Sequence, residues 1–213
     1  MSASPAAIRV LAARRARRSR PPKALVIGAL SVVALLLLTF LGSNLLASIN
    51  QWRLGERFDA AADHWARLDP VARSSITYSP GDPVAHLSIP SIGFDAIVVE
   101  GATPAIMRKG PGHLPASATP GENGVAIITA NRLGFGSFFL RLDRLSQGDR
   151  IVVLSAIGTT TYEVDSVRVV PPEEMDLAVD SPQRVLVLFG SSRLWGGSDR
   201  IVVRALAVED GSA

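Results

Sequence analysis

The stretch from Ala24 to Trp52 contains no charged residue, and it limits what the first part of the chain can form. Roughly 20 apolar residues are enough to cross a ~30 Å hydrocarbon core as a helix, and this run supplies more than that. Arginines precede the run and Trp52 closes it, as is typical of a cytoplasmic N-terminus and an exported body. We therefore expect a single-pass transmembrane anchor over residues 24–47. The alternative is a cleaved signal peptide, but the run exceeds the usual apolar core of about 7–15 residues.

The positive charge of the chain is concentrated in its first residues. Residues 1–23 carry seven of the 22 Lys and Arg residues and no acidic residue. The remaining chain therefore holds 15 basic residues against 19 acidic ones, so the body is mildly acidic. We interpret residues 1–23 as a basic cytoplasmic tail, and the distribution gives no support to nucleic-acid binding.

A stalk is expected over residues 48–78. Apolar side chains recur there at spacings of three and four residues, which predicts one apolar stripe on a helix that ends before Pro70. The stripe consists of Leu54, Phe58, Ala61, Trp65 and Leu68. The helix either leans on its own domain or mediates self-association or contact with a membrane surface.

Residues 79–213 have the pattern of an all-β domain. Short β-branched and apolar runs alternate with turn signals such as Pro80-Gly81, Pro120-Gly121 and Gly148-Asp149. About seven or eight strands with no long helical period predict one closed β-barrel or a sandwich. The chain has no cysteine, which excludes disulfides, thiol catalysis and thiolate metal sites.

Three blocks of this domain resemble the sortases, which are membrane-anchored transpeptidases of Gram-positive cell surfaces. The blocks are "GDPVAHLSIPSIGFDAIVVEGA", "MRKGPGHLPASATPGENGVAIITANRLGFGSFFLRLDRLSQGDRIVV" and "RVLVLFGSSRLWGGSDRIVVRA". The most similar subtype is the class E-like sortase of actinobacteria, and the resemblance covers about residues 81–208. It implies a sortase-like closed β-barrel, a membrane anchor and a sorting-signal peptide as partner.

The resemblance also assigns three catalytic positions. The sortase histidine falls on Asn131, which is followed by the retained Arg132. The nucleophilic cysteine falls on Ser191, or on Gly190 if the alignment slides by one residue, and the catalytic arginine falls on Arg200. Arg132, Phe135 and Trp195 are candidates for lining a peptide groove, although the two aromatic rings would equally suit a cap on the barrel.

These replacements remove the usual chemistry of the family. An amide cannot carry a proton as imidazole does, and a serine hydroxyl is a poor nucleophile without a neighbouring base. Losing members of such a catalytic set costs factors on the order of 10³ to 10⁶ in rate. We therefore expect a catalytically inactive, cell-surface member of the family that serves as a binding or assembly module.

Two alternatives stay open at the level of the sequence. One is an active peptidase or transpeptidase that uses Ser191 with Arg200. In that case His113 would be the candidate general base and Asp199 its acidic partner. The other is an envelope protein that no longer binds sorting signals. The sequence predicts neither a cofactor nor a metal site, because it has no ligand cluster and no phosphate-binding motif. His86 and His113 are interpreted as hydrogen-bonded structural residues.

Overall fold

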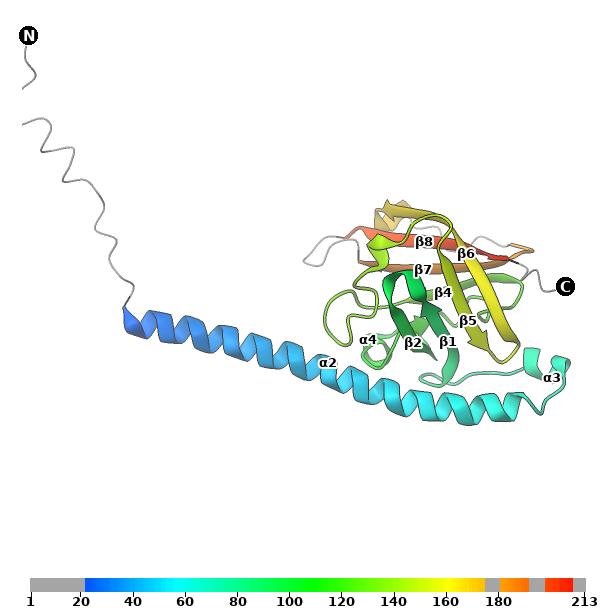
Figure 1. Cartoon of the computed structure of the whole chain (residues 1–213), viewed down its shortest axis with the longest axis horizontal. Helices are drawn as coiled ribbons and strands as arrows, with labels where there is room; N and C mark the ends of the chain where they lie inside the picture. Colours follow the sequence, from blue (N-terminus) through cyan, green and yellow to red (C-terminus); the bar gives the residue numbers. More distant parts are fainter. Residues whose placement is uncertain (1–21, 175–180, 192–197, 209–213) are drawn as a thin grey trace, which may run out of the picture. The chain divides into compact units, whose positions relative to one another are not determined.

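The computed structural model describes residues 22–174, 181–191 and 198–208, without the side chain of Ser191 (Figure 1). The chain divides into two compact units, residues 1–39 and 40–213. The basic tail therefore lies almost entirely outside the described residues. In the first unit, residues 23–39 form the beginning of helix α2, which spans Lys23–Trp65. This helix is long enough and apolar enough to cross a membrane.

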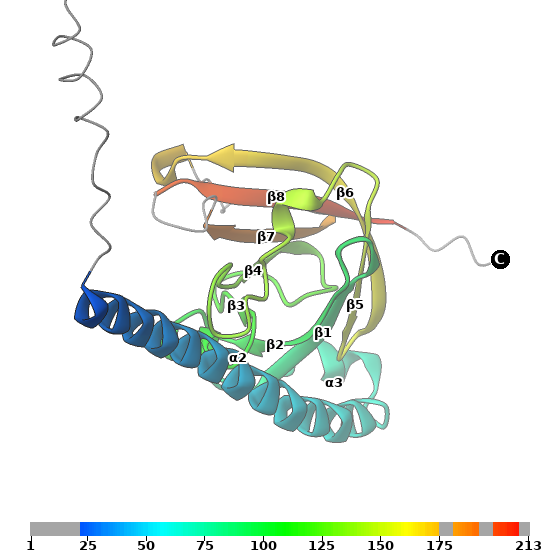
Figure 2. The ribbon, with the colours of Figure 1, turned by 60° about the vertical axis from the view of Figure 1, so that its left-hand side comes forward.

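The second unit is built on a closed β-barrel, as the sequence predicts (Figures 1 and 2). Its strands follow one another around the barrel in the order β1-β2-β3-β4-β7-β8-β6-β5. The β2–β3 and β4–β7 pairs are parallel, and the other pairs are antiparallel. The strand bounds are β1 Pro83–Ile89, β2 Phe94–Glu100, β3 Gly112–His113, β4 Gly124–Thr129, β5 Arg150–Ser155, β6 Gly158–Val170, β7 Arg184–Ser191 and β8 Arg200–Val208.

Short helical segments precede the first strand and connect several of the others. Helix α3 begins at Pro70 with Asp69 as its N-cap, whose side chain accepts from the Ala72 amide. Helix α4 begins at Pro104 in the same way, with Thr103 as its cap. Both starts combine a polar cap with proline in the first turn, where a missing N–H costs nothing. The bounds are α3 Pro70–Ser74, α4 Pro104–Met107, η1 Pro90–Ile92, η2 Leu142–Arg144 and η3 Pro172–Glu174.

Alternation along the strands fills the barrel interior. Alternate residues in the central parts of β4, β7 and β8 belong to one buried apolar cluster, as a period of two requires when one face of a strand is inside. The inward residues of these three strands are Ala126, Ile128, Leu186, Leu188, Ile201, Val203 and Ala205. Residues between them, such as Ile127, Val185 and Val187, form a separate cluster on the outer face of the same strands.

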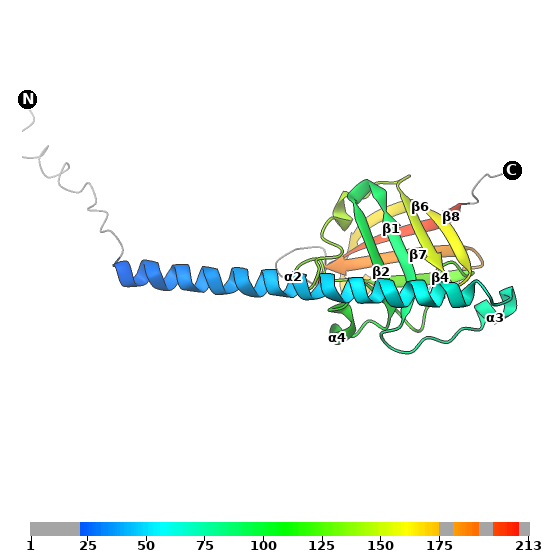
Figure 3. The same ribbon diagram turned by 60° about the horizontal axis from the view of Figure 1, so that its bottom comes forward.

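The second half of α2 packs on the outside of the barrel (Figure 3). Leu54, Phe58 and Trp65 are buried against Ile97 and Val99 of β2. Burying a side chain of this size contributes about 1.5–3 kcal/mol, so these contacts hold the helix firmly to the domain. The predicted apolar stripe therefore leans on its own domain. The structure joins the expected anchor and stalk into one helix that ends at Trp65.

Candidate functional site

The positions of Asn131, Ser191 and Arg200 meet at one end of three neighbouring strands. Thr129, the last residue of β4, is in register with Phe189 of β7, and Ser191 is in register with Arg200, the first residue of β8. Because β4 and β7 are parallel, Asn131 and Ser191 each lie two residues beyond the Thr129–Phe189 pair. Strand register thus brings together positions that are distant in the sequence.

Strand alternation also relates these positions to one face of the barrel. Position 191 shares the parity of Val187, and position 200 shares that of Val202, both members of the outer apolar cluster. The cluster has three buried members, and partly exposed side chains pack against them from the same strands and the loop after β3. Those partly exposed side chains are Leu114, Val125, Phe189, Val202 and Leu206.

Asn131 presents an unused amide at this corner. Its backbone carbonyl accepts from the Phe139 N–H at 3.1 Å, and the residue is half-buried. Within the described part of the chain, its side-chain amide has no hydrogen-bond partner. The amide can therefore donate to and accept from a ligand, although it cannot act as a base near neutral pH.

Arg200 turns its guanidinium onto the chain just before it. Nη1 donates to the Ser198 carbonyl at 2.5 Å and to the Asp199 carbonyl at 3.3 Å. No ion pair joins the Arg200 guanidinium to the Asp199 carboxylate in the described residues. Two short backbone contacts leave further N–H groups of the guanidinium available to a ligand.

A side chain at the Gly190 position would be tightly packed. A Cβ added there would lie 3.2 Å from the Ala130 carbonyl oxygen and 3.3 Å from Cγ of Arg132. Gly190 has the inward parity of Leu186 and Leu188, opposite to that of position 191. Position 191 has the parity of the outer face and Gly190 does not; the assignment of the sortase nucleophile to Ser191 stays a prediction.

Arg132 is a buried support of the loop that follows β4. It is 5 % exposed, and its guanidinium donates to the Phe139 carbonyl at 3.1 Å, the Leu140 carbonyl at 3.0 Å and Asp143 Oδ1 at 2.6 Å. A guanidinium suits this task because its donors form a rigid planar fork. These contacts direct the Arg132 side chain into the loop after β4. Arg132 therefore supports the loop that lies beside Asn131.

The loop next to Asn131 contains a run of left-handed backbone. Gly134, Phe135, Gly136 and Ser137 have φ values of 74°, 46°, 90° and 47°. This conformation is strained for a bulky residue such as Phe135 and is held only where the surroundings impose it. The Arg108 guanidinium lies 5.1 Å from the centre of the Phe135 ring, a cation–π contact that fixes a 38 % exposed ring. Trp195, the other aromatic candidate, lies outside the described residues.

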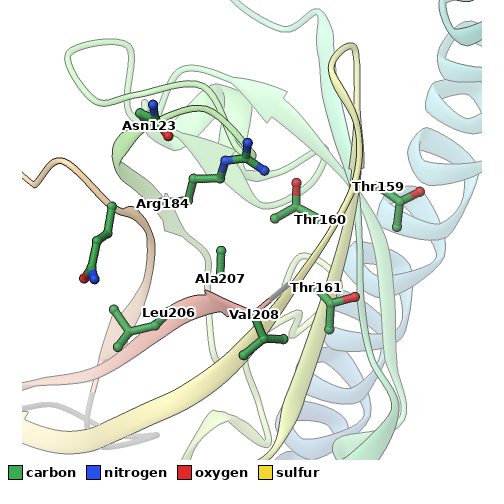
Figure 4. Close-up of a pocket in the computed structure, with 9 residues that line it drawn as sticks. Asn123, Thr159, Thr160, Thr161, Arg184, Leu206, Ala207 and Val208 are labelled. Atoms are coloured by element: carbon green, nitrogen blue, oxygen red, sulfur yellow. The ribbon is translucent and has the colours of Figure 1, made fainter. Parts of the chain in front are cut away.

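A pocket of about 350 Å³ lies between this loop and the η1 turn. Its lining includes Phe94, Asp95, Phe138 and Arg141. A larger pocket of about 620 Å³ lies at the opposite ends of β7 and β8, where Asn123, Thr160 and Arg184 contribute polar groups (Figure 4). Since β7 begins at Arg184 and ends at Ser191, the larger pocket is remote from the candidate site.

His113 is committed to a buried network and is not brought to Ser191. Its Nδ1 lies 2.8 Å from Glu100 Oε2, and its Nε2 lies 2.9 Å from the Ala118 carbonyl and 3.1 Å from Ser117 Oγ. A carbonyl only accepts, so Nε2 carries a proton and is no base. Ser117 Oγ already donates to the Leu114 carbonyl at 2.7 Å. Ser117, His113 and Glu100 contact one another in the order of a catalytic triad, but their hydrogen bonds make them a structural network.

The other histidine in the barrel also has a structural partner. His86 Nε2 lies 2.8 Å from Asp95 Oδ1 on the neighbouring strand, where both side chains are partly exposed. The described residues contain no cluster of three or more metal-binding side chains. Sequence spacing gave no sign of the Glu100–His113 contact, because β2 and β3 become neighbours only through the barrel topology.

Chemically, the corner offers hydrogen-bond donors and an apolar floor. It has an amide at Asn131, a guanidinium at Arg200 and a hydroxyl residue at position 191, but no thiol and no imidazole. Such a set can bind peptide carbonyls. Acyl transfer through a thioester would require a cysteine, which the whole chain lacks.

Comparison with known proteins gives a consistent family assignment. Residues 87–208 match the family model described as the sortase domain. Sortase D of Bacillus subtilis (strain 168) is 29 % identical over 108 residues, which is 50 % of this chain and 53 % of that protein. The chain thus spans about half the length of this curated relative.

Solved structures agree with the fold. A sortase D5 transpeptidase of Clostridium perfringens matches with a TM-score of 0.62 and 22 % identity, covering 77 % of this chain and 99 % of that one. Sortase C of Clostridium perfringens, solved with the C-terminal cell wall sorting motif, matches with a TM-score of 0.58 and 25 % identity. That match covers 62 % of this chain and 74 % of the other. On the match of the sortase domain to residues 87–208, this chain belongs to the sortase family.

Proposed function

We propose that this chain is a membrane-anchored, cell-surface sortase homologue, nearest to the class E-like sortases, that has lost transpeptidase chemistry and binds peptides. Its N-terminal tail lies in the cytoplasm and its barrel outside the cell. The barrel accepts an extended, sorting-signal-like peptide or a similar segment of another envelope protein on the outer face of β4, β7 and β8.

The observation that carries this proposal is the position of Asn131 beside Ser191 and Arg200. Strand register supports their assignment to the sortase catalytic positions, because they share one end of the barrel. An amide in place of imidazole leaves no group to protonate a leaving amine. The retained Arg200 can still bind a peptide carbonyl, because a guanidinium donates hydrogen bonds whether or not a nucleophile is present.

The apolar outer face supports peptide binding. Side chains of an extended peptide alternate, so one set would contact partly exposed groups such as Val125, Phe189 and Val202. The free amide of Asn131 would then pair with the peptide backbone at the end of this face. The sortase C solved with a sorting motif makes a peptide of that kind the first ligand to try.

One alternative is an enzyme that uses Ser191 as nucleophile. His113 cannot serve it, because both ring nitrogens are occupied by Glu100, Ala118 and Ser117. A second alternative is an envelope protein whose barrel binds no peptide at all. The polar corner argues for binding, because the Asn131 amide is half-buried without a partner in the described residues.

A binding and cleavage assay on the full-length protein in nanodiscs separates these functions. Fluorescent sorting-signal peptides would be followed both by anisotropy and by mass spectrometry of the products. We expect saturable binding without cleavage, and weaker binding for Arg200→Ala. Arg150→Ala is the control, since Arg150 is an exposed arginine of β5, a strand outside the proposed peptide-binding face.

Two outcomes contradict the proposal. Peptide turnover that disappears in Ser191→Ala would make the chain a serine enzyme. An absence of binding across a panel of such peptides, with the protein folded, would leave an envelope protein that does not recognise sorting signals.

A further inference from the structure

The junction between α2 and the barrel presents two different faces. On one face Ala47 and Leu54 are buried, at 1 % and 4 % exposed. The opposite face of the same helical turns points away from the barrel, and its apolar side chains are exposed. This exposed stripe consists of Leu45, Leu46, Ile49 and Trp52, at 63 %, 62 %, 39 % and 65 % exposed. All of these residues belong to the second compact unit.

Gln51 fixes the helix to the barrel at this level. Its Oε1 accepts from the Ile97 N–H at 2.7 Å, and its Nε2 donates to the Ile97 carbonyl at 3.1 Å and the Lys109 carbonyl at 3.0 Å. The side chain therefore occupies the edge of β2 where no strand pairs with it. Ile97 belongs to the barrel wall, so the barrel begins beside Gln51 with no flexible spacer.

The apolar stripe ends where charge begins. The first charge after the stripe is the exposed Arg53, and the same face of α2 then carries Glu56, Asp59 and Asp63 in the following turns, all exposed. Acidic side chains would be repelled by anionic lipid headgroups, whereas apolar and Trp side chains are favoured at a membrane interface. The change from apolar to charged side chains makes Trp52 the last residue of the stripe that would contact lipid.

Length agrees with this boundary. The uncharged run from Ala24 to Trp52 rises about 43 Å at 1.5 Å per residue, which exceeds a hydrocarbon core of ~30 Å. A bilayer with its headgroup layers is about 40–45 Å thick. If the run spans the whole bilayer, about 6 Å of it remains on each side of the core, so Ile49 to Trp52 lie in the outer headgroup layer and Leu45 and Leu46 lie at the edge of the hydrocarbon core.

The barrel contributes positive charge at the same level. Arg108 and Lys109 are both exposed and follow α4, and the Lys109 carbonyl accepts from Gln51. Residues 101–121 contain no acidic residue, so nothing in this segment offsets the two charges. Basic side chains next to an apolar stripe form a surface complementary to anionic lipid.

We infer that the Leu45–Trp52 stripe and the Arg108–Lys109 segment together form a lipid-contact surface, which holds the barrel directly on the headgroup layer of an anionic membrane. The inference rests on the proposed membrane anchor. It adds that the domain has no stalk: Gln51 locks the barrel to the helix inside the interfacial layer. The candidate peptide site is therefore held at a fixed short range from the lipid.

The absence of cysteine makes the test direct, because single cysteines can be labelled without background. The full-length chain would carry an environment-sensitive fluorophore at one position in vesicles containing phosphatidylglycerol. The positions are Leu36→Cys for the anchor, Ile49→Cys and Trp52→Cys for the stripe, Ala105→Cys for α4, and Asp63→Cys as control. Asp63 is exposed on the stripe side, three turns beyond Trp52. Quenchers attached to lipid at shallow and deep positions report depth.

We expect deep quenching at 36, shallow quenching at 49, 52 and 105, and none at 63. Quenching at 105 should fall toward its level in zwitterionic vesicles for Arg108→Gln/Lys109→Gln, but not for the control Arg150→Gln/Arg168→Gln. Absence of quenching at 36 would overturn the membrane anchor itself. Quenching at 36 without quenching at 49 and 52 would overturn only this inference. Disulfide-linked dimers of the unlabelled Ile49→Cys variant would also overturn it, because they would indicate a second copy on the stripe.

Discussion

The Nδ1 atom of His113 lies 2.8 Å from Oε2 of Glu100, and the two side chains are only 4 % and 8 % exposed. The pair joins β2 to β3 at the one place where these short strands meet. Ser117 extends the network to the Ile127 amide at 3.1 Å, which connects it to β4. A buried polar network therefore joins β2 and β3 to β4, one of the three strands that carry the candidate site.

Breaking this pair should destabilise the barrel strongly. His113→Ala leaves the Glu100 carboxylate buried without its partner, and we expect a loss of about 3–5 kcal/mol in the free energy of unfolding. Glu100→Gln retains an acceptor for Nδ1 and should cost about 1–2 kcal/mol. His86→Ala is the matched control, because its exposed pair with Asp95 should contribute less than about 1 kcal/mol. Urea unfolding in detergent, followed by near-UV circular dichroism, measures all three, and equal losses for His86→Ala and His113→Ala would contradict the network.

Both tyrosines of the chain should resist ionisation. Burial raises the pKa of Tyr162 from 10.0 to about 12, although the Gly121 N–H that donates to its oxygen opposes this. Burial, Glu122 and Glu100 together raise the pKa of Tyr78 to about 12. The unfolded chain ionises near pH 10, so the folded state binds more protons between pH 10 and 12 and loses stability there as the pH rises. Absorbance near 295 nm should therefore stay flat through pH 10, and a tyrosine titrating at 10 in the folded protein would contradict this packing.

Gln51 and Gly110 should be coupled energetically. A Cβ at position 110 would lie 2.8 Å from the Ile97 carbonyl and clash with Nε2 of Gln51. Gln51→Ala loses the contacts at the β2 edge and should cost about 2–3 kcal/mol. In Gln51→Ala/Gly110→Ala part of the clash is gone, so the double variant should be more stable than the sum of the single losses predicts. A double-mutant cycle by denaturant unfolding measures the coupling, and strict additivity would contradict the contact.

Arg132 should control the loop beside Asn131. Arg132→Lys cannot reach the Phe139 and Leu140 carbonyls and Asp143 together, so amides in 133–141 should exchange faster with deuterium. Asp143→Asn should have a weaker effect, because the Asp143 side chain is 54 % exposed. Hydrogen-exchange mass spectrometry resolves this segment. Unchanged protection in Arg132→Lys would show that the loop is held by other contacts.

The sequence allowed the barrel to be predicted because its strands follow simple alternation. The runs that became β4, β7 and β8 show a period of two, and their core residues followed from it. The division between an anchor over 24–47 and a stalk over 48–78 stays a prediction, because the change from an uncharged run to an amphipathic stripe at residues 48–54 does not break a helix. Only a helix-breaking residue would have done so, and α2 runs through to Trp65.

Only those residues of the candidate site that follow the end of a strand could be predicted from the sequence. Asn131, Ser191 and Arg200 follow strand ends, so their approximate meeting followed from resemblance to a known barrel. Contacts such as Gln51 with Ile97 span 46 positions and leave no periodic signal. The burial of Arg132 was equally invisible, since an arginine at a loop start usually faces water.

The claim that an active-site shape survives without its chemistry has one direct test. The full-length double variant Asn131→His/Ser191→Cys would be incubated with a sorting-signal peptide and analysed by intact mass after acid quenching. We predict a thioester adduct on this variant and none on the natural chain or on Asn131→His/Gly190→Cys, whose new side chain would meet Ala130 and Arg132. An adduct on the natural chain, or on the position-190 variant alone, would contradict the account.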